Sequence, residues 1–182
     1  MAYHHGDLRR ALLAAAVSAI EESGPTALSL RDLARRAGVS HAAPAHHFGD
    51  KAGLLTALAA DGYRLLDEAL RAGDNLLDRG VAYVRFAVDH RAHFEVMFRP
   101  ELYRPDDPEV VAAGRRAAQA LRSGVAALPT PPTGRRAELS ALAAWSIVHG
   151  FATLWLGGAL PSTLGEDPGV AARDVIRLLF EP

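Results

Sequence analysis

Apolar residues recur along most of the chain at spacings of three and four positions, which is the period of an amphipathic α-helix. In residues 7–23, one such face carries the series Leu8, Leu12, Ala16 and Ile20. Gly24 and Pro25 follow directly and predict where this helix stops. No segment of the sequence shows the strict alternation of apolar and polar residues that is typical of a half-buried strand. The pattern therefore predicts an all-α fold.

Three further helices are expected before residue 74, and each follows a residue of a type that commonly caps helices. Ser29 precedes a short helix, and Gly38 stands after it where a left-handed C-cap residue is expected. Ser40 precedes a second short helix that ends near Phe48. Asp50 precedes a long helix that reaches about residue 73. The inward positions of the first short helix are Leu30, Leu33, Ala34 and Ala37.

The second half of the chain predicts longer helices, separated by loops that contain proline and glycine. We expect helices over residues 76–90, 108–128, 136–156 and 168–180, and a short one around residues 94–98. Asp107-Pro108 and Asp167-Pro168 each match an N-cap residue followed by a first-turn proline. The run at 129–134, Pro-Thr-Pro-Pro-Thr-Gly, predicts a linker loop.

Composition agrees with a helical globular protein and excludes several other classes. The chain has 182 residues, of which 49% are apolar and 36 are alanine, the best helix former. A content this apolar argues against intrinsic disorder. The absence of cysteine excludes a disulfide framework, a thiolate metal site and a thiol nucleophile. The first residues are polar and do not resemble a secretory signal peptide, so we expect a cytoplasmic protein.

The charge of the whole chain gives no indication of a nucleic-acid partner, because the formal net charge is -1. Its distribution is slightly uneven. Residues 1–51 hold six basic and five acidic residues, whereas the remainder holds 14 and 16. Five of the eight histidines also fall in the first segment, and Lys51 is the single lysine of the chain.

Residues 29–48 predict a helix-turn-helix, because two short helices are joined by a turn that contains glycine. The second of these helices would enter the major groove of DNA. Side chains suited to phosphate contact surround it, with Ser29 and Ser40 at helix starts and Arg31 and Lys51 in first turns. Further contacts to bases or phosphates are expected from His41, Ala42, Ala43, His46 and His47.

This segment resembles the TetR family of bacterial transcriptional regulators. The resemblance rests on residues 12–16 (Leu-Leu-Ala-Ala-Ala), 29–34 (Ser-Leu-Arg-Asp-Leu-Ala), 37–40 (Ala-Gly-Val-Ser) and 46–48 (His-His-Phe), followed by Lys51 and Leu54-Leu55. Residues 145–150 (Trp-Ser-Ile-Val-His-Gly) resemble the Trp-His-Gly signature of one C-terminal subtype of that family. The resemblance implies a three-helix DNA-binding domain over 7–67 and an effector-binding and dimerisation domain over 68–182.

The sequence departs from the family pattern inside the recognition helix. Family members usually carry a hydrophobic residue followed by a tyrosine that contacts a phosphate, and here these positions are Pro44 and Ala45. A proline in the first turn of a helix costs less than one in its interior, so the fold is expected to tolerate Pro44. The tyrosine contact is absent, and His46 and His47 would have to contribute more to DNA binding.

The resemblance further implies a homodimer that binds a near-palindromic double-stranded operator. We expect it to be a repressor released by a small-molecule effector, not an enzyme, and without cofactor or metal. The candidate residues of the effector pocket are Phe86, His90, Phe94, Met97, Phe98, Trp145 and His149. The last two helices are implied to form a four-helix dimer interface, with the candidates Val148, Phe151, Trp155, Ile176 and Leu179.

Several alternatives stay open at the level of the sequence. His90 and His93 are three positions apart and, with His149, suggest a metal-dependent or histidine-dependent helical enzyme. No set of nucleophile, base and orienting residue accompanies them. His46 and His47 are adjacent on a helix and point about 100° apart, which disfavours a shared metal.

Three further alternatives are open. Residues 29–48 could form a helical hairpin without DNA contact, and a regulator of this fold could also work without a small-molecule ligand. Residues 141–160 have no charged side chain other than His149 and satisfy the length rule for a membrane span. An all-round apolar helix is also typical of buried core helices and subunit contacts, and we expect that interpretation and no membrane partner.

Overall fold

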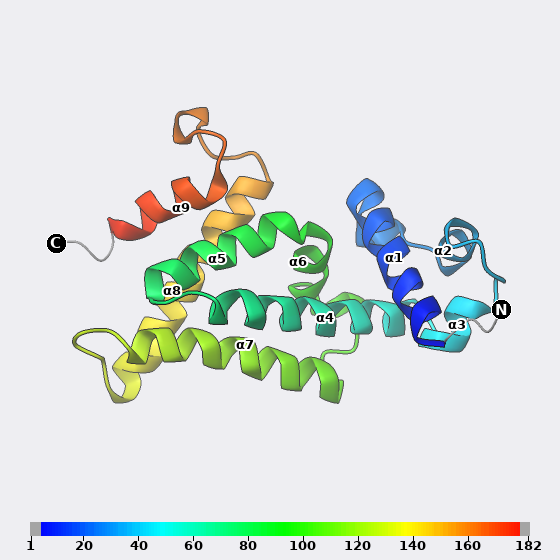
Figure 1. Cartoon of the computed structure of the whole chain (residues 1–182), viewed down its shortest axis with the longest axis horizontal. Helices are drawn as coiled ribbons and strands as arrows, with labels where there is room; N and C mark the ends of the chain where they lie inside the picture. Colours follow the sequence, from blue (N-terminus) through cyan, green and yellow to red (C-terminus); the bar gives the residue numbers. More distant parts are fainter. Residues whose placement is uncertain (1–4, 179–182) are drawn as a thin grey trace. The chain divides into compact units, whose positions relative to one another are not determined.

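The computed structural model describes residues 5–178, and every regular element in that range is a helix (Figure 1). This confirms the predicted all-α fold. The α-helices are α1 (His5–Ala27), α2 (Leu30–Arg36), α3 (Ala43–Phe48), α4 (Lys51–Arg71), α5 (Leu76–Asp89), α6 (Arg91–Met97), α7 (Pro108–Ala126), α8 (Gly134–Leu156) and α9 (Pro168–Arg177). Two short 3-10 helices lie between them, η1 (Pro100–Leu102) and η2 (Ser162–Leu164).

The helices group into two compact units. Unit 1 consists of the chain up to Tyr63 together with Arg91–Ala112. Unit 2 consists of Arg64–His90 together with the chain from Ala113 onward. The division expected from the sequence, at residues 67 and 68, therefore misses the second segment of unit 1. That segment joins the N-terminal helices because α6 packs on α1 and places its apolar side chains in the same core.

The core of unit 1 is continuous from the helix-turn-helix to the α6 segment. Its members come mainly from α1, α2, α4 and α6, and they include Leu12, Ile20, Leu33, Leu54, Leu58 and Val96, none of which is more than 1% exposed. Burial of side chains of this size contributes about 1.5–3 kcal/mol each, so this core dominates the stability of the unit. The α6 segment is therefore part of the unit that contains the predicted helix-turn-helix.

Backbone geometry confirms the turns expected around the helix-turn-helix. Gly24 has φ 75° and ψ 162°, which interrupts the helical backbone of α1. Gly38 has φ 65° and follows α2 in the left-handed conformation expected of its C-cap. Glycine tolerates this region because it has no Cβ.

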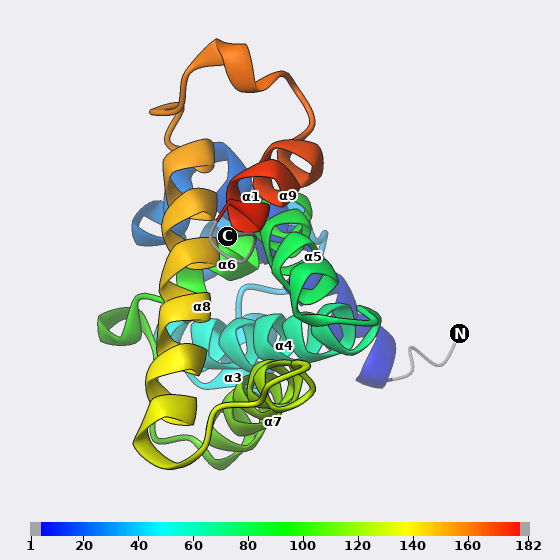
Figure 2. The ribbon, with the colours of Figure 1, turned by 90° about the vertical axis from the view of Figure 1, so that its left-hand side faces the viewer.

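Unit 2 is built around α5, which contacts both α8 and α9. Figure 2 shows α8 lying alongside these two helices. Gly80 lies where they meet, since a Cβ at that position would be 2.9 Å from Ile176 Cδ1 and 3.3 Å from Val148 Cγ1. The carboxylate of Asp167 accepts the N–H groups of Gly169 and Val170, which confirms the predicted cap of the last helix. Phe180, the expected end of that helix, lies outside the described residues.

Candidate DNA-binding site and effector region

Helix α2 carries three arginines, and they differ in what they contact. Arg35 and Arg36 both donate to Asp32, at distances of 2.6 and 2.7 Å. Arg36 also donates to Glu22 at 2.9 Å. Hydrogen bonds from Arg36 and Arg35 lower the pKa of Asp32, so this carboxylate stays charged. Arg31 is exposed and forms no ion pair with a carboxylate within residues 5–178, which leaves its charge available to an anionic partner.

Helix α3 begins later than the sequence indicates. Ser40 was expected to cap it, but the helix starts at Ala43, with Ala42 in the cap position. The reason is Pro44, which lacks the N–H that would bond the Ser40 carbonyl in a helix starting there. The N–H of Ala43 bonds that carbonyl instead at 3.0 Å, so Ser40, His41 and Ala42 lie in an exposed turn before the helix.

The two positions that depart from the family pattern take different environments. Pro44 is fully buried and fills the place of a hydrophobic residue, whereas Ala45 is exposed. His46 is exposed and His47 half-buried, with their ring centroids 5.6 Å apart. The exposed side of α3 therefore presents imidazole rings and no phenol.

The remaining predicted DNA-contacting residues lie at helix starts. Ser29 occupies the cap position of α2 without a side-chain capping bond. The ammonium of Lys51 donates to the carbonyl of Thr26 at 2.6 Å, which ties the start of α4 to the end of α1. An ammonium has three donors, so this bond leaves Lys51 able to contact a phosphate as well. Asp50 caps α4 by accepting the Gly53 N–H at 2.8 Å, as expected.

Two arginines near this surface were missed by the sequence analysis. The guanidinium carbon of Arg9 lies 5.3 Å from the centroid of the Phe48 ring, at the end of α3. The guanidinium of Arg104 binds the carboxylate of Asp50 at 2.8 Å, although the two residues are 54 positions apart. Neither contact leaves a signal in the local sequence pattern, because each joins residues that are far apart in the chain.

A polar cluster joins α5 to α8 inside unit 2. The indole N–H of Trp145 donates to the hydroxyl of Tyr83 at 3.3 Å, and that hydroxyl lies 2.9 Å from Nδ1 of His149. The hydroxyl accepts the indole N–H, and the direction of its bond with His149 is set by the tautomer of the imidazole ring. Burial lowers the pKa of His149, which agrees with a neutral ring. Two of the predicted pocket residues, Trp145 and His149, are thus in one hydrogen-bonded cluster.

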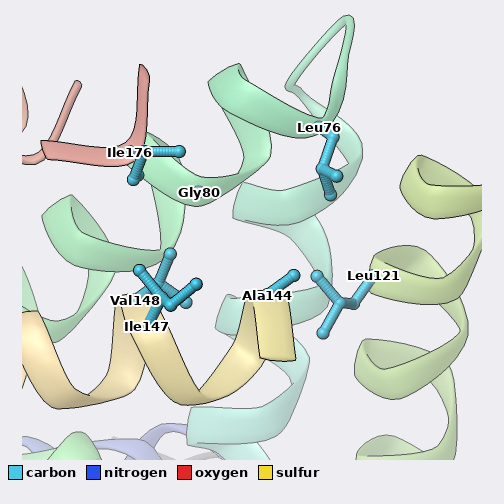
Figure 3. A pocket seen from close by; sticks show the side chains of 7 residues that line it. All are labelled: Leu76, Gly80, Leu121, Ala144, Ile147, Val148 and Ile176. Atoms are coloured by element: carbon cyan, nitrogen blue, oxygen red, sulfur yellow. The ribbon is translucent and has the colours of Figure 1, made fainter. Parts of the chain in front are cut away.

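The seven residues predicted for an effector pocket fall into different units. Phe86, His90, Trp145 and His149 belong to unit 2, and Phe94, Met97 and Phe98 to unit 1. The pocket found within unit 2 contains none of them (Figure 3). Its lining is entirely apolar and consists of Leu76, Gly80, Leu121, Ala144, Ile147, Val148 and Ile176. The space around it measures about 280 Å³ when open solvent is included, and the part between the side chains has room for about one water molecule.

Most of the residues predicted for a dimer interface are buried within unit 2. Val148, Phe151 and Ile176 are at most 7% exposed and pack within unit 2, so they have little surface to offer a second chain. Trp155 is half-buried and stacks on Phe151, with ring centroids 5.9 Å apart. Leu179 lies outside the described residues. Two largely apolar stripes run along α8, one with Ala141, Ala144, Val148, Phe151 and Trp155 and the other with Trp145, His149, Ala152 and Leu156. The sequence alone could not decide which stripe faces α5.

The outward face of α8 is also apolar. Leu139, Leu142 and Leu154 are each about half exposed, and Trp145 is 38% exposed. A Cβ at Gly150 would meet no atom within 4 Å. By length and composition α8 could cross a membrane, and 22% of its most apolar 18-residue window is buried. A single helix of this kind is weak evidence for a span.

The histidines considered as metal ligands are not grouped. His90 ends α5 and lies against Phe86, whereas His93 is buried in unit 1 with its Nε2 3.4 Å from Asp61. Within residues 5–178, no three His, Asp or Glu side chains are placed to hold a metal ion. The enzyme alternative based on His90, His93 and His149 gains no support from this arrangement.

Comparison with known proteins agrees with the helix-turn-helix geometry. A model of the tetR family of bacterial regulatory proteins matches residues 12–58, and one for a tetracyclin repressor-like C-terminal domain matches residues 76–179. No curated protein matches the chain. A protein of unknown function from Rhodococcus sp. RHA1 is 36% identical, with a TM-score of 0.78 over 98% of this chain and 96% of its own.

Two solved structures of regulators share the fold at lower identity. A tetR-family regulatory protein from Rhodococcus RHA1 is 23% identical, with a TM-score of 0.74 over 94% of each chain. PfmR, a TetR family transcriptional regulator from Thermus thermophilus, is 22% identical, with a TM-score of 0.71 over 92% of this chain and 96% of its own. The fold and the family models together define a helix-turn-helix transcriptional regulator. The chain belongs to the tetR family.

Proposed function

We propose that this regulator is a cytoplasmic repressor that binds a near-palindromic operator as a homodimer, through the exposed side of α3 and the basic residues around it. The observation that carries the proposal is the charge state of α2: Arg35 and Arg36 are neutralised by carboxylates, whereas Arg31 is exposed without an ion pair within the described residues. An unneutralised arginine beside a recognition helix is suited to a phosphate contact, which fixes the register of the protein on DNA.

Selection of bound sequences from random duplex DNA tests this proposal. We expect the purified chain to recover a near-palindrome, and its affinity to fall steeply with salt because phosphate contacts release counterions. Replacing Arg31 or Lys51 with alanine should make the slope of log affinity against log salt shallower by roughly one unit each. Arg35→Ala is the matched control, since Asp32 already neutralises that side chain. Recovery of no symmetric sequence would refute operator binding.

The homodimer is proposed to form through the outward face of α8. Leu139, Leu142 and Leu154 expose apolar surface there, and an exposed patch of this kind typically marks an association surface. Gly150 lies on the same helix, and no atom of its own chain is close enough to require a glycine there. A glycine at this position suits the close approach of a second helix. A two-fold related copy would present the same face, as symmetric dimers require. Light scattering of the purified chain tests the stoichiometry.

The effector is proposed to be a small apolar molecule that enters unit 2 at the pocket between α5, α7, α8 and α9. The wholly apolar lining supports this chemistry, since no charged or hydrogen-bonding side chain contributes to it. Binding would have to open the pocket, and it shifts the regulator only by its differential affinity for the two states. Release of the selected operator by short-chain hydrocarbons or alcohols, measured by fluorescence anisotropy, tests the proposal.

A second candidate is a regulator of the same fold that has no small-molecule ligand. The small free space in the pocket favours this version, because the side chains of Leu76, Leu121 and Ile176 leave room for little more than a water molecule. If no apolar compound changes operator affinity or raises the unfolding temperature, control by a protein partner or by abundance is the better account.

A further inference from the structure

A segment from the second half of the chain reaches the turn that joins the recognition helix to α4. Helix α3 ends at Phe48 and α4 begins at Lys51, so only Gly49 and Asp50 separate them. Nη2 of Arg104 donates to both carboxylate oxygens of Asp50, at 3.0 and 2.8 Å. One of these oxygens also accepts the N–H of Gly53 at 2.8 Å. The same carboxylate therefore caps α4 and holds a side chain from residue 104.

The backbone at Arg104 is fixed on α4 by a partly buried hydrogen bond. Its N–H donates to Oγ1 of Thr56 at 3.0 Å, and that hydroxyl donates to the carbonyl of Ala52 at 2.7 Å. Thr56 is 6% exposed, and the neighbouring Tyr103 is 8% exposed, with its hydroxyl bonded to the carbonyl of Met97 at 3.0 Å. The main chain at 103–104 is thus anchored, and only the guanidinium extends to the surface.

The contact is also sterically specific. An ideal Cβ at Gly53 would lie 1.9 Å from the carbonyl oxygen of Phe48 and 2.9 Å from Nη1 of Arg104. The absence of a side chain at Gly53 allows the last carbonyl of α3, the first turn of α4 and the guanidinium to approach one another. Hydrogen bonding to Gly53, with Arg104 beside it, lowers the pKa of Asp50, so the carboxylate is charged across the range in which DNA binding is measured.

We propose that Arg104 is a positioning residue for DNA binding, which holds the turn between α3 and α4 so that the recognition helix and Lys51 are presented in one orientation. This inference rests on the proposed DNA-binding function. The bond from Nη2 to two carboxylate oxygens fixes geometry in a way that a single bond does not. Both side chains are about half exposed, so their pairing adds little to the global stability of the fold. The charge of Arg104 is balanced by Asp50 and is not assigned to a phosphate.

Operator affinity of four full-length chains tests this assignment: the unsubstituted protein, Arg104→Gln, Arg104→Lys and Arg99→Gln. Arg99 is the matched control, because it lies on the same loop with similar exposure and pairs with Glu101 instead of Asp50. The probe is the duplex that the unsubstituted protein selects from random DNA, titrated at several salt concentrations. The N–H of Gly53 donates to the Asp50 carboxylate. The rate of hydrogen exchange at this N–H therefore reports directly how well the turn is held.

We expect Arg104→Gln to weaken affinity by about 2- to 30-fold. The slope of log affinity against log salt should stay unchanged, and exchange at Gly53 should accelerate more than exchange in the core. Arg104→Lys should restore part of the affinity, and Arg99→Gln should bind as the unsubstituted protein does. A slope shallower by about one unit in Arg104→Gln would make Arg104 a phosphate ligand and overturn the assignment. Unchanged affinity in Arg104→Gln would also overturn it, whereas failure of the unsubstituted protein to select DNA would overturn the proposed function itself.

Discussion

The substitution Gly150→Leu is expected to change the stability of the single chain and the stability of the dimer in opposite directions. A Cβ at Gly150 meets no atom within 4 Å, so a leucine there has open space within the chain. Gly150 lies inside α8, away from both of its ends. Replacing a glycine in a helix interior by a good helix former stabilises the helix by about 0.5–1 kcal/mol. The single chain should therefore become slightly more stable.

The effect on the dimer should have the opposite sign. If the outward face of α8 meets its copy at Gly150, the added side chain occupies space that the partner helix needs. Overpacking of a close contact costs about 1–3 kcal/mol, and the two-fold axis repeats it in both chains, which gives about 2–6 kcal/mol. That corresponds to a dissociation constant at least roughly 30-fold higher than that of the unsubstituted protein.

Sedimentation velocity over a concentration series measures the dimer, and urea unfolding of the dilute protein measures the single chain. Gln119→Leu adds a similar apolar group on the exposed side of α7 and should leave the dimer intact. A Gly150→Leu protein that dimerises as tightly as the unsubstituted chain would refute the assignment of this face.

Three further outcomes follow from the described contacts. Burial lowers the pKa of His149, so the folded state disfavours its protonation: this contribution to stability is fully present above the unfolded value of about 6.5 and is lost as pH falls below it. Urea midpoints at pH 7.5 and 5.5 should therefore differ less in His149→Gln than in the unsubstituted protein, and an equal difference would contradict the burial argument. Gly53→Ala should lower stability by about 1–3 kcal/mol or more, since its Cβ would lie 1.9 Å from the backbone oxygen of Phe48, and a neutral effect on the urea midpoint would show that the close approach is absent. Leu58→Ala removes a side chain that is 1% exposed and should cost about 2–5 kcal/mol in the same assay, with a cost below 1 kcal/mol arguing against a shared core.

The helix ends show how much local sequence can establish. The caps at Asp50 and Asp167 and the left-handed Gly38 were all predicted, because each depends on residues within a few positions of itself. The start of α3 was predicted wrongly at Ser40 although the decisive residue is only four positions away. The helical pattern alone does not weigh the missing N–H of Pro44, whose effect depends on where the first turn falls.

The candidate DNA-binding residues could be proposed from sequence because a helix-turn-helix is a local motif. The sequence did not show which of the arginines in this motif are neutralised by carboxylates. Arg31, Arg35 and Arg36 look alike in the sequence, and only their contacts with Asp32 and Glu22 distinguish the neutralised side chains from the available one. The candidate pocket residues were implied by the family resemblance, and the structure places them in two units, whereas aliphatic residues and Gly80 line the pocket of unit 2.

The sequence by itself determined the class of fold, the helix-turn-helix and most helix boundaries, since these depend on periodicity and on interactions within one or two turns of chain. Tertiary structure alone decided which stripe of α8 faces α5, because both stripes are apolar and hydrophobic burial has no direction of its own. It also decided that the segment around Arg104 joins the DNA-binding unit and reaches Asp50, 54 positions earlier. A contact over that separation depends on how the helices pack, and no periodicity in the chain encodes it.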